Sequence, residues 1–466
     1  MKLTRKDAFI INILFAIIII FISILNINDA MYFMYIFPIL IITFLVFIGI
    51  YYKKVHNHFM NFDFIFIILL WLFGMSRQVT YWFGFDSYTS YYGNFELSVY
   101  FRAYLFTFMC IFLYYVGSFK TINYEINYNY DLNDKSYYIE RIRRIVFIIF
   151  IICLLPMVYY YYKLINVSMV AKYGSKQYVE MIENTNYLIS LLRVFGVISL
   201  IILVFIEFHA KTKFRYFIFI LFLSIGIISL LCGSRTEGLS IYLLFICMFV
   251  RKAKLSLIKK IGLIISIILL IIMIPLFFEI RMDITNIKNI DFLSYFSFDS
   301  IWSAFHELGG SETAMLLVVD GNYGVQYGQS ILLAVFNTLF NFLPSSIRPD
   351  LSSIGPVSLA YYFTKELNLN YGLGFSLFGE MFLNFSWFGC LFFLILRICL
   401  DKLYNKSDFI SVLKSFIMIY ILFTMPRRET KDLFTEIVYY YLPFSILLYF
   451  VCKPYYSSYK ERVELF

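Results

Sequence analysis

Residues 8–25 read AFIINILFAIIIIFISIL, a run without any charged side chain. A helix needs about 20 predominantly apolar residues to cross the hydrocarbon core of a bilayer. Runs of similar length recur along most of the chain, separated by short polar connectors. Because lipid offers no hydrogen-bonding partner to the backbone, such runs cross a membrane as α-helices. This pattern decides the fold class.

The composition of the whole chain agrees with this interpretation. Of 466 residues, 61% are hydrophobic and 15% are charged, whereas soluble domains contain about 45–50% apolar and about 25% charged residues. The sequence therefore predicts an all-α, polytopic integral membrane protein. The net charge of +9 comes from basic residues in the connectors, where they act as topology signals. It therefore does not indicate a nucleic-acid partner.

The apolar runs predict about 12 transmembrane helices. They lie near residues 8–25, 31–50, 62–75, 98–118, 145–162, 187–208, 214–231, 238–250, 261–278, 376–396, 409–424 and 437–451. The third and eighth runs are shorter than the others. The first run is not followed by a small-residue cleavage site, which predicts an uncleaved first helix.

The distribution of Lys and Arg predicts the orientation of these helices. With the N-terminus in the cytoplasm, the cytoplasmic connectors hold about twice as many basic residues as the outer ones, in line with the positive-inside rule. Both termini then lie in the cytoplasm, as an even number of spans requires. Several arginines lie outside against this bias: Arg235, Arg281, Arg348, Arg427 and Arg428.

One long segment interrupts the pattern of spans. Residues 279–375 contain no apolar run of full transmembrane length, and loops this long are uncommon unless they are functional. The chain therefore divides into transmembrane helices at 1–278, a large external loop at 279–375, and further helices with a cytoplasmic tail at 376–466. The apolar run at 330–343 is short and Pro344 follows it, which predicts a re-entrant segment covered by protein.

The first candidate site is a polar break at residues 232–238, CGSRTEG. Gly233 permits a tight turn, and Ser234 or Thr236 could cap the helix that follows. A capped helix N-terminus with Arg235 beside it suits a phosphate or pyrophosphate group. The alternative is a plain turn whose arginine extends to the membrane interface.

The second candidate site lies between Arg281 and Glu312 and contains His306 and Glu307. A histidine can accept a proton from a hydroxyl near neutral pH, and a carboxylate can serve instead. Adjacent helical residues point in different directions, so these two side chains are alternatives and not a dyad. Gly310 occupies the last position of an HExxH motif, so no zinc site is predicted. The alternative is a surface turn in which His306 only packs.

The third candidate site lies in residues 371–389, YGLGFSLFGEMFLNFSWFG. Glu380 and Asn384 are four residues apart on one helical face, with Ser376 and Gly379 nearby. A carboxylate within an apolar helix is costly unless it faces a polar cavity or a partner, so Glu380 is a candidate functional residue. The alternative is close helix packing with Glu380 paired to an arginine.

The fourth candidate site is the outer connector at residues 426–432, PRRETKD, with Arg427 and Arg428. A solvated charge run is the ordinary explanation of such a segment. Its position against the positive-inside rule favours anion binding.

In these features the chain resembles the Wzy-type polymerases, which join oligosaccharide repeat units of O-antigen or capsule in bacterial membranes. The resemblance rests on the turn at 233–235, the large external loop, the segment leading from 327–330 to Pro344, and the Gly, Ser, Glu and Asn pattern at 372–389. It covers nearly the whole chain in topology. Such proteins often carry a basic residue directly after the proline, where this chain has Ser345 and, further on, Arg348.

The resemblance implies a GT-C-like architecture and a defined reaction. A growing glycan passes from undecaprenyl pyrophosphate to the non-reducing-end sugar of another lipid-linked repeat unit, at the outer face of the bacterial cytoplasmic (inner) membrane. No cofactor is implied. A metal-independent mechanism is expected, because the outer connector at 26–30 is too short for the acidic pair of metal-dependent transferases. Implied partners are undecaprenyl-pyrophosphate-linked oligosaccharides, membrane lipids and a chain-length regulator protein.

The resemblance also distributes roles among the candidate residues. Candidates for catalysis are His306, Glu307 and Glu380. Candidates for pyrophosphate binding, in order of preference, are Arg235 and Arg281, then Arg348, Arg427 and Arg428. Candidates for glycan binding are Ser234, Ser376 and Asn384.

Three alternatives remain open at this point, one of which is a sensor or scaffold without catalysis. An O-antigen ligase would share the external loop, its arginines and its histidine. A lipid-linked oligosaccharide flippase belongs to another class and would show two similar halves, charged residues inside its helices and no large external loop. The two halves of this chain are unlike each other, and the Gly, Ser, Glu and Asn pattern favours the polymerase over the ligase.

Overall fold

The computed structural model of the chain describes residues 5–27, 29, 31–56, 62–82, 89–90, 93–119, 136–170, 181, 187–210, 212–232, 234–252, 262, 265, 269, 272–277, 280, 292–321, 323–340, 343, 347–368, 374–404 and 409–451. This part is helical apart from two short antiparallel strands, β1 (Thr89–Ser90) and β2 (Gly93–Asn94), in which Thr89 pairs with Asn94.

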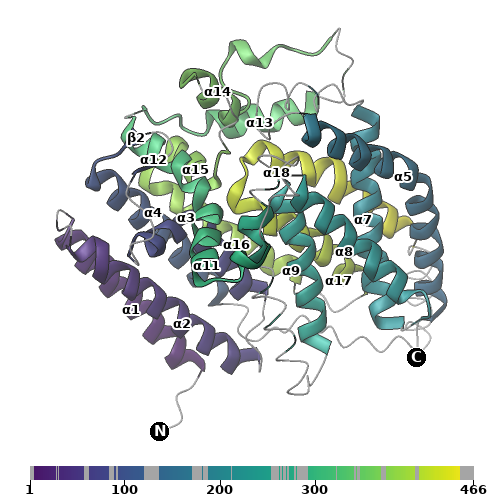
Figure 1. The fold of residues 1–466 in the computed structure, drawn as a ribbon, viewed down its shortest axis with the longest axis horizontal. Helices are drawn as coiled ribbons and strands as arrows, with labels where there is room; N and C mark the ends of the chain where they lie inside the picture. The colour runs from purple at the N-terminus through teal and green to yellow at the C-terminus, as the bar shows by residue number, and fades with distance from the viewer. Residues whose placement is uncertain are drawn as a thin grey trace, which may run out of the picture.

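The longer helices run through the body of the molecule (Figure 1). They are α1 (Arg5–Leu25), α2 (Phe37–His56), α3 (Phe62–Trp82), α4 (Leu97–Gly117), α5 (Ser136–Val170), α7 (Tyr187–Ala210), α8 (Arg215–Leu231), α9 (Arg235–Lys252), α16 (Leu391–Tyr404) and α17 (Phe409–Thr424). The shorter α-helices are α11 (Phe298–Leu308), α12 (Glu312–Asp320), α13 (Gln329–Phe340), α14 (Leu359–Glu366), α15 (Leu377–Phe385) and α18 (Thr430–Glu436).

Short 3-10 and π segments extend or join these helices. The π segments are η1 (Tyr32–Ile36), before α2, and η10 (Ile437–Tyr441), after α18. The 3-10 segments are η5 (Phe292–Tyr295), η6 (Gly309–Ser311), η7 (Leu351–Ser353), η8 (Ser386–Cys390) and η9 (Met425–Arg427). The helical segment formed by α18 with η10 therefore exceeds the length of its α-helical part, whereas the backbone between α15 and η8 turns at Ser386, whose φ is 50°.

Within the described residues, 8 helical segments are long and apolar enough to cross a membrane. They are Arg5–Leu25, Tyr32–Val55, Phe62–Trp82, Leu97–Gly117, Ile139–Val170, Leu188–Phe208, Leu377–Asp401 and Thr430–Val451. The prediction of a helical, polytopic membrane protein is confirmed. The other predicted spans correspond to the shorter helices α8, α9 and α17, and to residues 261–278, half of which lie outside the described part.

Several spans extend beyond their predicted limits, and two of them do so across polar residues. The run at 62–75 was expected to end at its first polar residues, but α3 continues to Trp82 through a kink at Met75, whose φ and ψ are −159° and 18°. The last span begins at Thr430, ahead of the expected 437–451. In both cases the hydropathy pattern placed the boundary of the span inside the helix. Hydropathy does not distinguish a polar side chain that faces protein from one that faces water.

The arrangement of α5, α7 and α9 agrees with the predicted alternation of spans. Arg143, near the start of α5, forms an ion pair of 2.7 Å with Glu207, near the end of α7. At the opposite end, Tyr161 of α5 and Arg193 of α7 both donate hydrogen bonds to Glu237 of α9. Helices α5 and α7 are therefore antiparallel, and α9 begins beside the start of α7.

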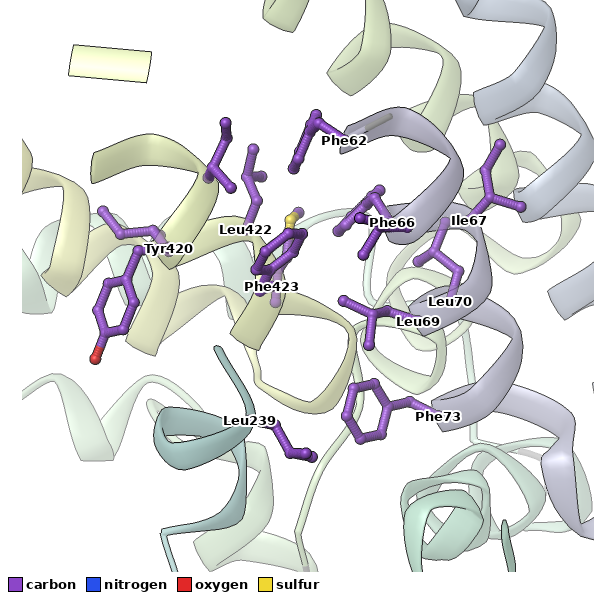
Figure 2. Packing of buried hydrophobic residues seen from close by; sticks show 14 of the residues in the cluster. Phe62, Phe66, Ile67, Leu69, Leu70, Phe73, Leu239, Tyr420, Leu422 and Phe423 are labelled. Carbon is purple, nitrogen blue, oxygen red and sulfur yellow. The ribbon is translucent and has the colours of Figure 1, made fainter. Parts of the chain in front are cut away.

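A continuous apolar core joins the helices from both halves of the chain. Helix α3 packs against α17, where the rings of Phe62 and Phe423 lie 5.6 Å apart. Figure 2 shows Phe66 and Leu69 of α3 facing Phe423, with Leu239 of α9 at the edge of the same cluster. The chain thus folds as one packed bundle in which α3 lies at the centre.

Residues 279–375, predicted as one external loop, consist largely of helices where they are described. Helix α11 packs against α3, α12 packs against α4 and α15, and α13 packs against α18. The expected re-entrant segment at 330–343 corresponds to α13, a single helix of 12 residues. Figure 1 shows α13 and α14 together at one end of the molecule. Part of the predicted loop is therefore built into the bundle.

Arg397 directly follows the predicted span at 376–396 and is buried in the bundle. Its side chain is 0% exposed and pairs with Asp63 of α3 at 2.8 Å and with Asp401. Tyr114 of α4 donates to the same Asp63 at 3.3 Å. A buried arginine must be paired to offset the loss of its hydration. Arg397 therefore ties α16 to α3 and α4.

Candidate active site

The sequence pattern at 376–389 folds into α15 and the 3-10 turn η8. Ser376 is the N-cap residue of α15, and its Oγ accepts a hydrogen bond of 3.2 Å from Gly379 N, as serine commonly does at this position. Gly389 is required in the turn, because a side chain there would collide with the backbone oxygen of Met381. The motif thus builds a short helix with a fixed start and a fixed exit.

Glu380 lies at the centre of the site. Its side chain is 1% exposed, and its carboxylate joins three helices. Oε1 accepts a hydrogen bond of 3.1 Å from Ser330 Oγ on α13, and Oε2 accepts one of 2.6 Å from the backbone N of Thr430, the first residue of α18. Both donors are neutral. Glu380 is therefore a buried carboxylate held by hydrogen bonds from neutral groups. These contacts differ from the alternative of a structural ion pair with an arginine.

Asn384 completes this arrangement one helical turn after Glu380. Its Nδ2 donates to Ser330 Oγ at 2.7 Å and to the backbone oxygen of Glu380 at 2.8 Å. The side chain is 0% exposed, and its Oδ1 has no hydrogen-bond partner among the described residues. A buried polar atom without a partner is costly, so Oδ1 is the atom of this arrangement that still lacks a donor.

A second carboxylate, Glu429, lies next to Thr430 in the chain. Its Oε1 accepts from Ser358 Oγ at 2.6 Å, and its Oε2 accepts from the backbone N of Leu359 at 2.6 Å and of Ala360 at 3.4 Å. Glu429 therefore caps the N-terminus of α14, where free N–H groups and the helix dipole favour a negative charge. Burial raises the pKa of this carboxyl above its ordinary value, and the nearby charge of Asp432 adds to the increase.

The two predicted arginines of the 426–432 connector are partly buried and not freely solvated. Arg427 ends the turn η9, which packs against α3, α15 and α17. Arg428 donates through Nη1 to Glu436, which follows it by 8 residues and lies at the end of α18. The connector is therefore folded onto the bundle beside Glu380, and Arg428 has a carboxylate partner of its own.

The turn at 232–238 is organised by Glu237 on α9. Ser234 Oγ donates to its Oε2 at 3.2 Å, and Arg193 Nη1 donates to both carboxylate oxygens at 3.0 Å. The guanidinium of Arg193 also lies 4.5 Å from the centre of the Tyr160 ring, a cation–π contact. Gly233 and the side chain of Arg235 lie outside the described residues, so their predicted roles stay predictions.

A buried tyrosine links the two ion pairs around this region. Tyr420 of α17 interacts electrostatically with Glu237 and with Glu436, and these two glutamates interact with each other. The partly buried pairs Arg193–Glu237 and Arg428–Glu436 therefore lie within electrostatic range of each other, between α7 and α9 on one side and the last span on the other.

His306 lies near the end of α11 and faces α3. Its Nε2 is 3.5 Å from Nη2 of Arg77, and its backbone oxygen accepts from Arg77 Nε at 3.2 Å. Glu307 is the next residue of the same helix and is partly buried. Because a guanidinium can only donate, this geometry suits a neutral His306 whose Nε2 accepts. His306 and Glu380 therefore contact different helices, and the described contacts do not bring them together.

The remaining predicted residues divide into three groups. Arg281 lies outside the described residues. Arg348 is exposed, and its Nη2 donates to the backbone oxygen of Leu343 at 3.3 Å. Ser376 is 0% exposed and caps α15, so its predicted contact with a glycan stays a prediction. Among the described site residues, Glu380 contacts both Ser376, whose backbone oxygen accepts from Glu380 N at 3.0 Å, and Asn384.

Comparison with known families gives the evolutionary assignment. The sequence profile of the family described as O-antigen polysaccharide polymerase Wzy matches residues 8–460, nearly the whole chain. This chain belongs to the Wzy family. Comparison with curated proteins and with solved structures gave no match. The resemblance found from the sequence is thus confirmed, and O-antigen polymerisation, which joins saccharide units, is the broad function of the family.

Several charged residues of this Wzy polymerase were missed by sequence reasoning: Arg77, Arg193, Glu312, Glu429 and Glu436. Each is buried or partly buried and bonded to another helix or segment. The available signal was the presence of a charge inside or at the edge of an apolar run, which marks a residue facing the bundle interior. By this signal, only Glu380 was predicted to be functional.

Proposed function

We propose that this Wzy polymerase joins oligosaccharide repeat units carried on undecaprenyl pyrophosphate, at the outer face of the bacterial cytoplasmic membrane. The orientation comes from the Lys and Arg bias of the connectors. Twelve spans, cytoplasmic termini, a GT-C-like architecture and a chain-length regulator as partner belong to the same proposal. The observation that supports it most is the buried, hydrogen-bonded carboxylate of Glu380.

The reaction requires one bond to form and one to break. The hydroxyl oxygen of the acceptor sugar bonds to the anomeric carbon of the donor glycan. The bond between that carbon and the pyrophosphate oxygen breaks, and its electron pair leaves with undecaprenyl pyrophosphate. The hydroxyl proton passes to a base. A carboxylate positioned within hydrogen-bonding reach can accept this proton as the new bond forms.

Glu380 fits the role of the base better than His306 does. Its oxygens are fixed by Ser330 and Thr430, so the carboxylate needs no reorganisation during the reaction. Asn384 Oδ1, next to it, can accept a hydrogen bond from a sugar hydroxyl. His306 instead faces the guanidinium of Arg77, so its Nε2 already has a hydrogen-bond partner within the protein.

The leaving pyrophosphate requires cations. Arg427 and Arg428 precede Glu429 and Thr430 directly in the chain, so the donor to Glu380 and the two guanidinium groups belong to one short segment. Arginine binds phosphate oxygens in a bidentate geometry and stabilises charge that grows in the transition state. Arg235 and Arg281 remain proposed contributors from the turn at 232–238 and from the long loop.

Deletion of the gene followed by gel analysis of surface polysaccharide tests the proposal. A polymerase deletion leaves a single repeat unit on the acceptor. A ligase deletion removes all polymer from lipid A and leaves free lipid-linked chains. A deletion strain with neither phenotype supports a flippase and contradicts the proposal.

Complementation with variants tests the assignment of the base. Glu380→Gln keeps the size of the side chain and should leave single repeat units, with wild-type amounts of protein in the membrane. His306→Ala should retain polymer. If cells with Glu380→Gln make polymer and cells with His306→Ala do not, then His306 is the base and Glu380 is not.

A further inference from the structure

Two neighbouring residues hold two different parts of the site. The side chain of Glu429 caps α14 through Ser358 Oγ and the backbone N of Leu359, both at 2.6 Å. The backbone N of the next residue, Thr430, donates to Glu380 Oε2, also at 2.6 Å. Glu429 and Thr430 are 5% and 2% exposed. One buried peptide unit therefore connects α14 with the carboxylate of Glu380.

Helix α14 is also attached to the helix that carries Glu380. Leu359 and Phe363 of α14 form a small apolar cluster with Phe375 and with Leu383 of α15. The rings of Phe363 and Phe375 are stacked at 5.3 Å. The apolar cluster and the Glu429 cap are thus two attachments of α14, one to α15 directly and one through the start of α18.

The position of Thr430 explains why its N–H is available to Glu380. Thr430 is the first residue of α18, and the first N–H groups of a helix have no acceptor within that helix. Glu429 precedes it with extended backbone angles, φ −83° and ψ 160°. Because consecutive Cα atoms are separated by a fixed distance of about 3.8 Å, a displacement of Glu429 by α14 displaces the donor of Glu380.

We propose that Glu429 and Thr430 form a positioning element that couples the docking of α14 to the orientation of Glu380. This inference rests on the proposed role of Glu380 as base. Thr430 N–H fixes the carboxylate oxygen, and Glu429 fixes Thr430 by its bonds to α14. Neither residue exchanges a proton with the substrate. Segment 347–368, within the long predicted loop, then sets the rate of the reaction without contacting the reacting atoms.

Thr430→Pro removes the N–H that reaches Glu380, together with the threonine side chain. Proline is favoured at the first position of a helix, and the extended angles of Glu429 are those that a residue before proline adopts. Thr430→Ala removes the side chain and keeps the N–H. Comparison of these two variants therefore separates the hydrogen bond from the side chain.

Variants of Glu429 test the other half of the element. Glu429→Gln can keep the cap, because its amide oxygen accepts from Leu359 N and its amide nitrogen donates to Ser358 Oγ. Glu429→Ala removes the cap. Ser358→Ala removes one of the bonds, and its matched control is Ser353→Ala, because Ser353 Oγ bonds only locally to the backbone oxygen of Asp350.

The assay uses membranes of the deletion strain that express each full-length variant, supplied with lipid-linked repeat units extracted from the same strain. The values of kcat and KM are normalised to the amount of membrane-inserted protein. Misplacement of a catalytic group by about 1 Å can cost about 100-fold in rate. We expect kcat to fall about 10- to 100-fold in Thr430→Pro relative to Thr430→Ala, and in Glu429→Ala relative to wild type, with little change in KM. Glu429→Gln should recover most of kcat, and Ser353→Ala should equal wild type.

Two results would overturn the inference. One is equal kcat in Thr430→Pro and Thr430→Ala, and the other is a Glu429→Gln variant as slow as Glu429→Ala. Failure of the proposed function looks different, because wild-type membranes would then not extend the repeat units, or Glu380→Gln would extend them at the wild-type rate.

Discussion

Arg77 on α3 donates its Nε hydrogen to the backbone oxygen of His306 on α11, at 3.2 Å. The same guanidinium donates through Nη1 to Thr313 Oγ1 on α12, at 3.4 Å. Arg77 is buried and lies just after the kink at Met75. One side chain of α3 therefore holds both the end of α11 and the start of α12, which places α12 against the helix of Glu380.

Replacement of Arg77 should destabilise this part of the bundle. Hydrogen bonds to charged groups contribute about 1.5–3 kcal/mol each, so we expect Arg77→Ala to lower the free energy of unfolding by about 3 kcal/mol. Arg102→Ala is the control, because Arg102 is an exposed arginine on the neighbouring helix α4. Thermal denaturation of the detergent-purified protein measures the effect. Equal midpoints for the two variants would show that the Arg77 contacts contribute nothing.

The two adjacent glycines after α11 should respond differently to substitution. A Cβ at Gly309 would lie 2.7 Å from Ser76 Oγ and 2.8 Å from Arg77 Cγ, whereas at Gly310 the nearest atom would be 3.8 Å away. Overpacking of this kind costs about 1–3 kcal/mol. We expect Gly309→Ala to lower the amount of polymer and the denaturation midpoint, and Gly310→Ala to leave both unchanged. The reverse order would mean that α11 does not pack on Ser76 and Arg77 in this way.

The sequence predicted those features of the fold and the site that a single local pattern of residues determines. Continuous apolar runs indicated the membrane class, and the spacing of Glu380 and Asn384 placed both on one helical face. The same spacing could not identify Ser330 or Thr430, which lie 50 residues away from Glu380 in either direction. These contacts depend on how α13 and α18 pack against α15, and periodicity within one helix does not encode that packing.

Arg193 shows a second reason for incomplete prediction. It lies inside the apolar run at 187–208, which also contains Glu207 and was predicted as an ordinary span. Its partner Glu237 lies in the polar segment at 232–238. In that segment a functional role was predicted for Arg235 and none for Glu237. A charge within a span is costly without a partner, so each such residue implies a second one elsewhere. The sequence alone does not identify Glu237 as the partner of Arg193, because several carboxylates could take this role. The packing of the helices decides among them.

The Arg193–Glu237 pair offers a test that separates stability from function. Removal of one partner leaves a buried charge and costs about 3–5 kcal/mol, whereas apolar replacement of both is often neutral or stabilising. We expect Arg193→Met and Glu237→Leu each to lower the denaturation midpoint, and the double variant to regain most of it. Polymer in cells that express the stable double variant would show a purely structural pair. Loss of polymer in that variant would show that Arg193 or Glu237 also serves the reaction.

The raised pKa of Glu429 predicts how its cap responds to pH. Its pKa in the folded protein lies above its ordinary value of about 4.3, because burial disfavours the charged form. The folded state therefore binds the proton more tightly than the unfolded state does. The resulting stabilisation is complete below the ordinary pKa and is lost as the pH rises through the raised pKa.

Glu429→Gln has no such dependence at this position. We expect the denaturation midpoint of wild type, relative to Glu429→Gln, to fall with rising pH across this window, as measured in one detergent over a series of buffers. A relative midpoint that increases with pH would mean that the bonds from Ser358 and Leu359 lower the pKa more than burial raises it.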